Sequence, residues 1–215
     1  MEELKKILKK FCIENLKTDS DWYNWTIKDE YLPRGIEMSN DSRIQRNLSL
    51  KEQLHSKWSE SDDKTKEELI EYYIVRWGGI RGNKKETLDI YKKSPSQELI
   101  KRGINGVSSW SKALVLHDCN KYAIFDARVS TSLNYLQVIN NTKEKILFPV
   151  LPSQNNKIKF ANRKLKEISK DWKKVGNNEF YSLYLELLFV TAKELNTNIS
   201  IIEMLLFAKS TDLIK

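Results

Sequence analysis

Cysteine, histidine and long apolar runs are scarce in this sequence, and each scarcity excludes a class of protein. Cys12 and Cys119 are too few and too far apart for a disulfide framework. Together with only two histidines, they exclude a four-cysteine iron–sulfur cluster and disfavour a structural zinc site. The longest apolar runs, such as LELLFV at 185–190, fall far below the roughly 20 residues that a membrane span needs. We therefore expect no metal, no cofactor and no membrane partner.

The length and the charge of the chain point to a globular protein with an anionic partner. The first residues, MEELKKILKKF, lack the apolar region of a signal peptide, so we expect a cytoplasmic protein. With 215 residues the chain can bury a core, in one domain or in two closely packed lobes. Its 37 Lys and Arg against 29 Asp and Glu give a net charge of +8. This excess favours partners that carry phosphate.

Helix-start signals and helical apolar spacing recur along the chain. Capping side chains three residues before a Glu or Gln occur at Ser49, Asn83, Ser94 and Ser200. Only KILFPVL at 145–151 is a candidate for extended structure. The pattern predicts an all-α protein with irregular segments at 18–47 and 140–156. The expected helices are 2–17, 49–59, 63–77, 84–93, 95–102, 108–118, 126–139, 157–173, 178–195 and 200–210.

Lys112 and Asp126 are two charged residues that this apolar pattern does not require. Lys112 lies about 200° around its predicted helix from Trp110, off the buried stripe. It is either a surface lysine or a functional one. Asp126 follows an apolar run and precedes a helix, so N-capping is a sufficient explanation for it. The argument for chemistry rests on the pair.

The motifs around this pair resemble a known family. The stretch GVSSWSKA at 106–113, followed by IFDARV at 124–129, is similar to the helix-hairpin-helix DNA glycosylases, in particular the lysine-bearing branch that includes the 8-oxoguanine DNA glycosylases. Ser111-Lys112 matches the lysine motif on the second helix of the hairpin, and Asp126 matches the aspartate at the start of the following helix. The match covers about 30 residues directly, and 201–207 adds a similar closing helix.

The chain departs from the family pattern in two places. Alignment on Lys112 puts Ser108 and Trp110 where the hairpin normally has glycines, and only 14 positions separate Lys112 from Asp126. The resemblance implies a divergent member with two helical lobes and an interlobe cleft, in a single glycosylase-like domain over 1–215. One lobe would comprise about 1–47 with 121–215, and the other about 48–120.

The resemblance implies that the chain excises a damaged or modified base from double-stranded DNA. The base would be flipped out of the duplex into the cleft. Lys112 would attack C1′ of the deoxyribose, provided that burial or a neighbouring cation supplies the neutral amine. Asp126 would stabilise the positive charge that develops on the sugar. We expect the two side chains to lie within roughly 8 Å of each other, neither held only by a structural bond.

Further candidate residues are aromatic or basic. Four aromatic residues are candidates for stacking on the flipped base, although each also fits an ordinary core: Trp77, Trp110, Phe125 and Phe207. Trp77 is the most informative, because Gly78-Gly79 follows it and permits close approach by a ligand. Arg128 would touch phosphate, pair with the neighbouring aspartate or face water. Four basic residues before the lysine motif either contact the DNA backbone or face solvent: Lys84, Lys85, Lys101 and Arg102.

Two other functions fit the same sequence. A DNA-binding module on this scaffold that has lost catalysis would explain the missing hairpin glycines. An unrelated helical interaction protein would explain the charge and the helix caps, with the lysine and aspartate motifs as coincidence. The sequence identifies neither the base that is excised nor a protein partner.

Overall fold

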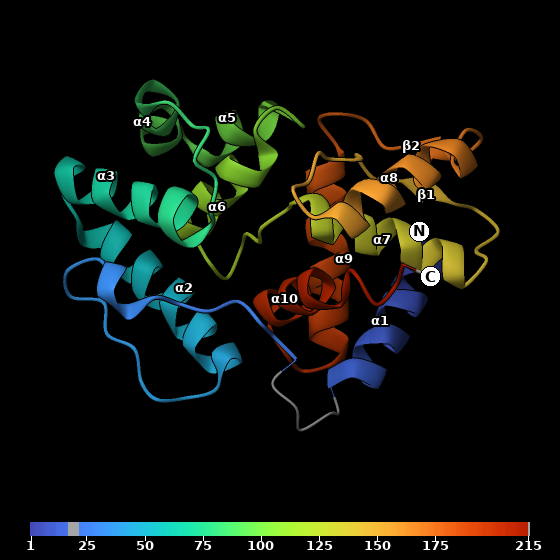
Figure 1. Ribbon diagram of the computed structural model, residues 1–215, viewed down its shortest axis with the longest axis horizontal. Helices are drawn as coiled ribbons and strands as arrows, with labels where there is room; N and C mark the ends of the chain where they lie inside the picture. The colour runs from blue at the N-terminus through green and yellow to red at the C-terminus, as the bar shows by residue number, and fades with distance from the viewer. Residues whose placement is uncertain (17–21, 215) are drawn as a thin grey trace. The chain divides into compact units, whose positions relative to one another are not determined.

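The computed structural model describes residues 1–16 and 22–214, and its regular structure is almost entirely helical (Figure 1). The prediction of an all-α chain is confirmed at this level. Contacts along the chain divide it into two compact units. Unit 1 comprises Met1–Trp22 with Phe125–Lys215, and unit 2 comprises Tyr23–Ile124.

Unit 2 is organised around helix α6 (Val107–His117), which carries Lys112. Trp110, Ala113 and Leu114 of this helix are fully buried, as their helical spacing predicts. α6 packs against α2, α4, α5 and η2. The other elements of the unit are the 3₁₀ turn η1 (Asp29–Tyr31), α2 (Arg43–Glu60), α3 (Asp63–Glu71), the π-helix η2 (Tyr72–Trp77), α4 (Lys85–Lys93) and α5 (Ser96–Lys101).

Unit 1 is organised around helix α7 (Ala127–Ile139), which follows Asp126. α7 is buried along almost its whole length and packs against α1, α8 and α10. The other elements of the unit are α1 (Glu2–Leu16), β1 (Ile146–Leu147), α8 (Asn156–Ile168), β2 (Lys173–Lys174), α9 (Phe180–Glu194) and α10 (Ile199–Lys209).

The segment predicted as extended forms β1, which pairs in parallel with β2. Ile146 lies opposite Lys173, and the backbone N–H of Lys173 donates to the Lys145 carbonyl at 3.1 Å. The predicted helix over 157–173 is therefore too long. The helix ends at Ile168. After a short turn, Lys173 and Lys174 form β2 and pair with β1.

Several helices begin at other residues than the capping patterns predict. α2 begins six residues before Ser49, because the Ser42 hydroxyl accepts from the backbone N–H of Gln45 at 3.3 Å. α10 is capped by Asn198, two residues before Ser200. The amide of Asn83 donates instead to the Ser109 hydroxyl at 2.9 Å. Polar residues that can cap are frequent in this chain, so spacing alone does not select the one that does.

The division between the two units falls earlier in the chain than the expected lobe boundary near residue 47. Residues 23–47 belong to unit 2, where long-range hydrogen bonds hold them. Trp25 Nε1 donates to the Trp77 carbonyl at 3.1 Å, and Asn47 Nδ2 donates to the Trp25 carbonyl at 3.0 Å. These bonds join the loop to α2 and to the end of η2.

Candidate functional site

Lys112 is a buried lysine in the middle of α6. Its side chain is only 4% exposed, and its Nζ donates to the Ser108 carbonyl one turn earlier at 2.7 Å. The stripe through Trp110 is buried, and so is Val115 on the side of the helix that Lys112 shares. The reading of Lys112 as an ordinary surface lysine is therefore excluded. The structure also gives its amine a bond to its own helix.

Gly78 allows Lys112 to occupy this position. A Cβ atom at Gly78 would lie 2.6 Å from Lys112 Cε and 2.7 Å from the Ile74 carbonyl oxygen. Real Cβ atoms essentially never approach other heavy atoms so closely. The sequence predicts that Gly78-Gly79 admits a ligand, but at Gly78 the Lys112 side chain fills the space.

The backbone before Gly78 is a π-helix. The N–H of Gly78 donates to the Tyr73 carbonyl at 3.1 Å, five residues back, instead of four as in an α-helix. Such wide turns are rare and occur frequently at functional sites. Here the π-helix brings Tyr72, Arg76 and Trp77 into the wall of one pocket.

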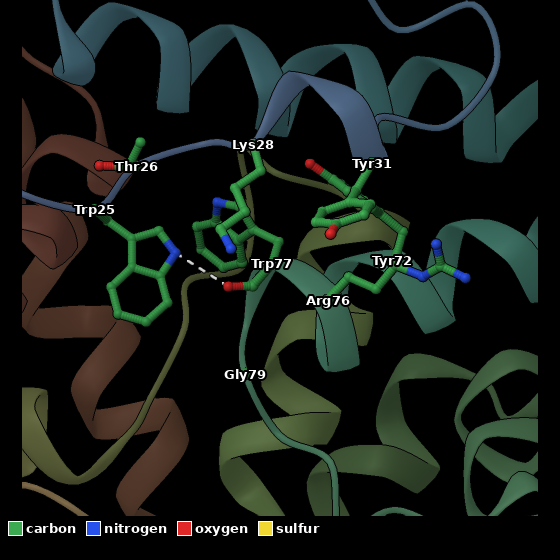
Figure 2. Close-up of a pocket in the computed structure, with 8 residues that line it drawn as sticks. All are labelled: Trp25, Thr26, Lys28, Tyr31, Tyr72, Arg76, Trp77 and Gly79. Carbon is green, nitrogen blue, oxygen red and sulfur yellow. Dashed lines mark hydrogen bonds between the residues drawn. The ribbon is translucent and has the colours of Figure 1, made fainter.

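A pocket of about 180 Å³ lies in unit 2 between η2 and the loop before α2 (Figure 2). The Trp77 ring stacks on Tyr73 with centroids 4.5 Å apart and meets the Trp25 ring at 66°. Its Nε1 donates to Asn47 Oδ1 at 3.2 Å. The lining residues are Trp25, Thr26, Lys28, Tyr31, Tyr72, Arg76, Trp77 and Gly79.

The pocket combines aromatic faces with positive charge. Lys28 Nζ lies 5.8 Å from the centre of the Tyr31 ring, and Arg76, which pairs with Glu71 at 3.4 Å, also lines the pocket. Among the described residues that line it, none is acidic. Burial, with a smaller effect from the Asp29 charge, raises the pKa of Tyr72 to about 12, so its hydroxyl stays protonated at neutral pH. The pocket thus suits a flat, hydrogen-bonding and anionic group.

Asp126 caps helix α7, as the sequence suggested. Its Oδ1 accepts from the backbone N–H groups of Arg128 at 2.9 Å and Val129 at 3.0 Å. Both capping bonds fall on one carboxylate oxygen, so Oδ2 takes no part in the cap. Asp126 belongs to unit 1 and Lys112 to unit 2. Their predicted convergence on one cleft stays a prediction.

The other three aromatic candidates occupy different environments from Trp77. Trp110 is fully buried, and its Nε1 donates to the Gly103 carbonyl at 3.1 Å. Phe125 is fully buried in unit 1, among rings that include Phe180 at 5.0 Å. Phe207 is partly exposed, and the Arg128 guanidinium lies 4.8 Å above its ring. In the described structure Trp110 and Phe125 therefore serve as core.

The basic candidates differ in how far their charges are already paired. Lys85 bonds Glu67 at 3.0 Å, and Lys101 bonds Glu98 at 2.7 Å. Arg102 packs its guanidinium over the Tyr91 ring at 5.5 Å. Lys84 is exposed and occupies the N-cap position of α4.

Sequence reasoning missed most of the pocket. Trp25, Lys28 and Tyr31 lie in the segment predicted to be an irregular loop of the other lobe. Tyr72 and Arg76 lie in the predicted helix over 63–77, whose last turns form a π-helix instead of a regular α-helix. The feature of the sequence that could have predicted the pocket is the high density of tryptophan and tyrosine in an otherwise polar loop. Such side chains usually pack and find hydrogen-bond partners when they are buried.

Each of the two histidines has a hydrogen-bond partner in unit 2. Burial, with a smaller effect from the Lys66 charge, lowers the pKa of His117 to about 4, and its Nδ1 lies 3.1 Å from the Ser96 hydroxyl. Within residues 1–16 and 22–214, no group of three or more potential ligands could hold a metal ion.

None of the helices in that same part of the chain combines the length and apolar character needed to cross a bilayer. Comparison of the chain with protein-family models, with curated proteins and with solved structures finds no match.

Proposed function

We propose that the protein is a DNA glycosylase that excises a damaged or modified base, with Lys112 as nucleophile and Asp126 as the electrostatic residue. One observation carries the proposal. A lysine that is only 4% exposed packs against Gly78, and the two residues beside Gly78, Trp77 and Gly79, line an aromatic pocket. Keeping a lysine in such a place costs desolvation free energy, which a purely structural residue would avoid.

The residue types fit the chemistry of this proposal. The reaction requires the Lys112 amine in its unprotonated form. The amine then forms a bond to C1′ while the bond from C1′ to the base breaks, and the base leaves with the electron pair and takes up a proton. Opening of the sugar then gives a Schiff base between Lys112 and C1′. The Asp126 carboxylate stabilises the positive charge that develops on the sugar during base departure.

The pocket offers a place for an unstacked base. A base that has left the duplex regains stacking on aromatic side chains, worth about 1–3 kcal/mol per base. Trp77 and Trp25 supply the rings, and the Tyr72 hydroxyl supplies a donor. A volume of about 180 Å³ is below the roughly 300–1,000 Å³ of drug-sized sites, which favours a single ring system.

A non-catalytic DNA-binding module on the same scaffold is the second candidate. It is favoured by the hydrogen bonds of the two key side chains. Lys112 Nζ donates to the Ser108 carbonyl, and Asp126 Oδ1 caps α7. In this reading both residues serve the fold. The pocket would then bind an unpaired base without cleaving it.

Borohydride trapping separates the two candidates. Duplexes that each carry one modified base are incubated with the protein and sodium borohydride, which reduces a Schiff base to a stable covalent complex. We expect wild-type protein to form this complex with at least one duplex. Lys112→Gln should abolish it, and Asp126→Asn should slow base release on the order of 100-fold. Asp126→Asn should keep its stability, because Asn caps as well as Asp.

The matched control is Lys93→Gln, which removes an exposed lysine at the end of α4. This variant should form the complex at the wild-type rate. Full excision by Lys112→Gln would overturn the catalytic assignment. Binding of duplexes without excision of any base tested would favour the non-catalytic module.

A further inference from the structure

The positive charge of the chain is concentrated in one segment of unit 1. Residues 143–174 contain ten Lys and Arg against three Asp and Glu, so this segment carries seven of the eight net positive charges. It spans β1, α8 and β2, drawn in yellow and orange in Figure 1. The basic candidates chosen from the sequence lie outside it.

Helix α8 sorts these charges onto its exposed side. Its apolar side is buried through Ile158, Ala161 and Leu165, which follow helical spacing. Eight cations of α8 and the following residues through β2 are exposed: Lys157, Lys159, Arg163, Lys164, Lys166, Lys170, Lys173 and Lys174. Lys159, Arg163 and Lys166 recur at i, i+4 and i+7, so they form a ridge about 10 Å long.

These eight cations have no acidic partner in the part of the chain that the structure describes. Some cations elsewhere are paired, as Lys85 with Glu67 and Lys5 with Glu186. Like charges on adjacent turns of a helix repel and destabilise it by a few tenths of a kcal/mol per pair. A polyanion that binds this surface would remove the repulsion.

Exposed aromatic side chains lie among the cations. Phe160 is 54% exposed, and Lys164 Nζ lies 4.7 Å above its ring. Trp172 is partly exposed, with Lys145 Nζ at 6.0 Å from its ring centre. Flat rings between cations match the stacking faces and charges of a nucleic acid.

We infer that the exposed side of α8, together with β2, binds the phosphate backbone of a nucleic acid strand. The ridge of Lys159, Arg163 and Lys166 contacts successive phosphates, and Lys170, Lys173 and Lys174 extend the contact. A membrane surface fits less well, because the continuous apolar stripe of α8 is buried in unit 1, which leaves Phe160 and Ile168 as separate exposed apolar side chains of the helix. The inference rests on the proposed function in that it takes DNA as the partner.

The test is the salt dependence of binding to an unmodified duplex, which requires no base excision. Each phosphate contact contributes about 0.9 to the slope of log affinity against log salt concentration. The triple variant Lys159→Gln, Arg163→Gln, Lys166→Gln should flatten this slope by about 2 to 3 and weaken binding at low salt at least tenfold. A comparison triple, Lys84→Gln, Lys85→Gln, Lys101→Gln, removes the same charge from the rival surface, the basic residues that the sequence offers as DNA contacts. It should change the slope by less than about 1, because Lys85 and Lys101 already have carboxylate partners.

A second triple variant, Lys170→Gln, Lys173→Gln, Lys174→Gln, serves as the test if circular dichroism shows that the first triple variant is misfolded. A wild-type slope in both folded α8 and β2 variants, with a flattened slope in the comparison triple, would overturn the inference and assign the DNA contact to the rival surface. Binding to phosphatidylserine vesicles that needs α8, without binding to DNA, would overturn it in favour of a membrane. Absence of duplex binding by the wild type would instead remove the proposed function as well.

Discussion

Gly78 shows how one missing side chain organises the surroundings of Lys112. Its φ of −77° and ψ of −11° are open to any residue, so conformational freedom does not explain the glycine. Space does, because a Cβ would meet the Lys112 side chain and two backbone carbonyl oxygens. The carbonyl oxygens of Tyr73 and Ile74 belong to the π-helix and have little room to move.

Gly78→Ala should therefore destabilise the protein. An alanine at an accessible φ and ψ usually stabilises by a few tenths to about 1 kcal/mol, and here the steric cost reverses the sign. Overpacking of this kind costs roughly 1–3 kcal/mol, which urea unfolding would measure. Gly82→Ala is the control, since a Cβ there meets nothing within 4 Å. Equal stabilities for the two variants would show that the lysine and the turn move apart freely.

The sequence singles out Lys112, Asp126 and Trp77 but says little about how they bond. Lys112 stands out because a charge interrupts an apolar helix, and Asp126 because it precedes one. The bond from Lys112 to Ser108 depends on which rotamer fits beside Gly78, and that is a matter of packing. Trp25 joins Trp77 across 52 positions, a pairing that no local pattern contains.

At the scale of elements, side-chain amides of α7 make the backbone hydrogen bonds that a neighbouring strand would make to the segment around β1. Gln137 Nε2 donates to the Ile146 carbonyl at 2.8 Å, and its Oε1 accepts from the Ile146 N–H at 2.7 Å. Asn134 bonds the N–H and carbonyl of Phe148 in the same way, at 3.0 and 3.2 Å. The two amides lie one turn apart and satisfy alternate residues of the extended segment. The backbone groups on the edge of this segment that faces α7 are thereby hydrogen-bonded without another strand.

Gln137→Leu should cost about 2–4 kcal/mol of unfolding free energy. The substitution keeps the bulk but leaves the buried N–H and carbonyl of Ile146 without a partner, at about 1–3 kcal/mol each. Gln97→Leu, at an exposed position of α5, should stay within about 0.5 kcal/mol of the wild type. Thermal unfolding of both variants would measure the difference. A Gln137 variant as stable as the Gln97 variant would mean that water replaces the amide.

The positions of the helices are largely predictable, whereas their ends and special turns are not. Apolar spacing places α1, α4, α6 and α9 to within about two residues. The caps are Ser42 and Asn198 instead of Ser49 and Ser200. The end of a helix depends on how far it packs against neighbouring elements, which local spacing does not contain. The π-helix of η2 cannot be predicted from apolar spacing, because that spacing assumes 3.6 residues per turn.

At the scale of the whole molecule, unit 2 is an insertion between two segments of unit 1. The chain enters unit 2 at Tyr23 and leaves it at Ile124. The candidate residues follow the same division, with Lys112 and the aromatic pocket in unit 2, and Asp126 and the basic surface of α8 in unit 1.

This organisation predicts that residues 23–124 fold without the rest of the chain. They form one continuous segment with its own buried core, which includes Leu50, Leu69, Tyr73 and Leu114. The isolated segment should be helical by circular dichroism and should unfold in a single cooperative urea transition. In that fragment, Gly78→Ala should lower the midpoint as it does in the full chain, because every atom that its Cβ would meet lies within unit 2. A fragment that unfolds gradually, or is indifferent to Gly78→Ala, would mean that unit 1 supplies part of the packing that holds Lys112 against the turn.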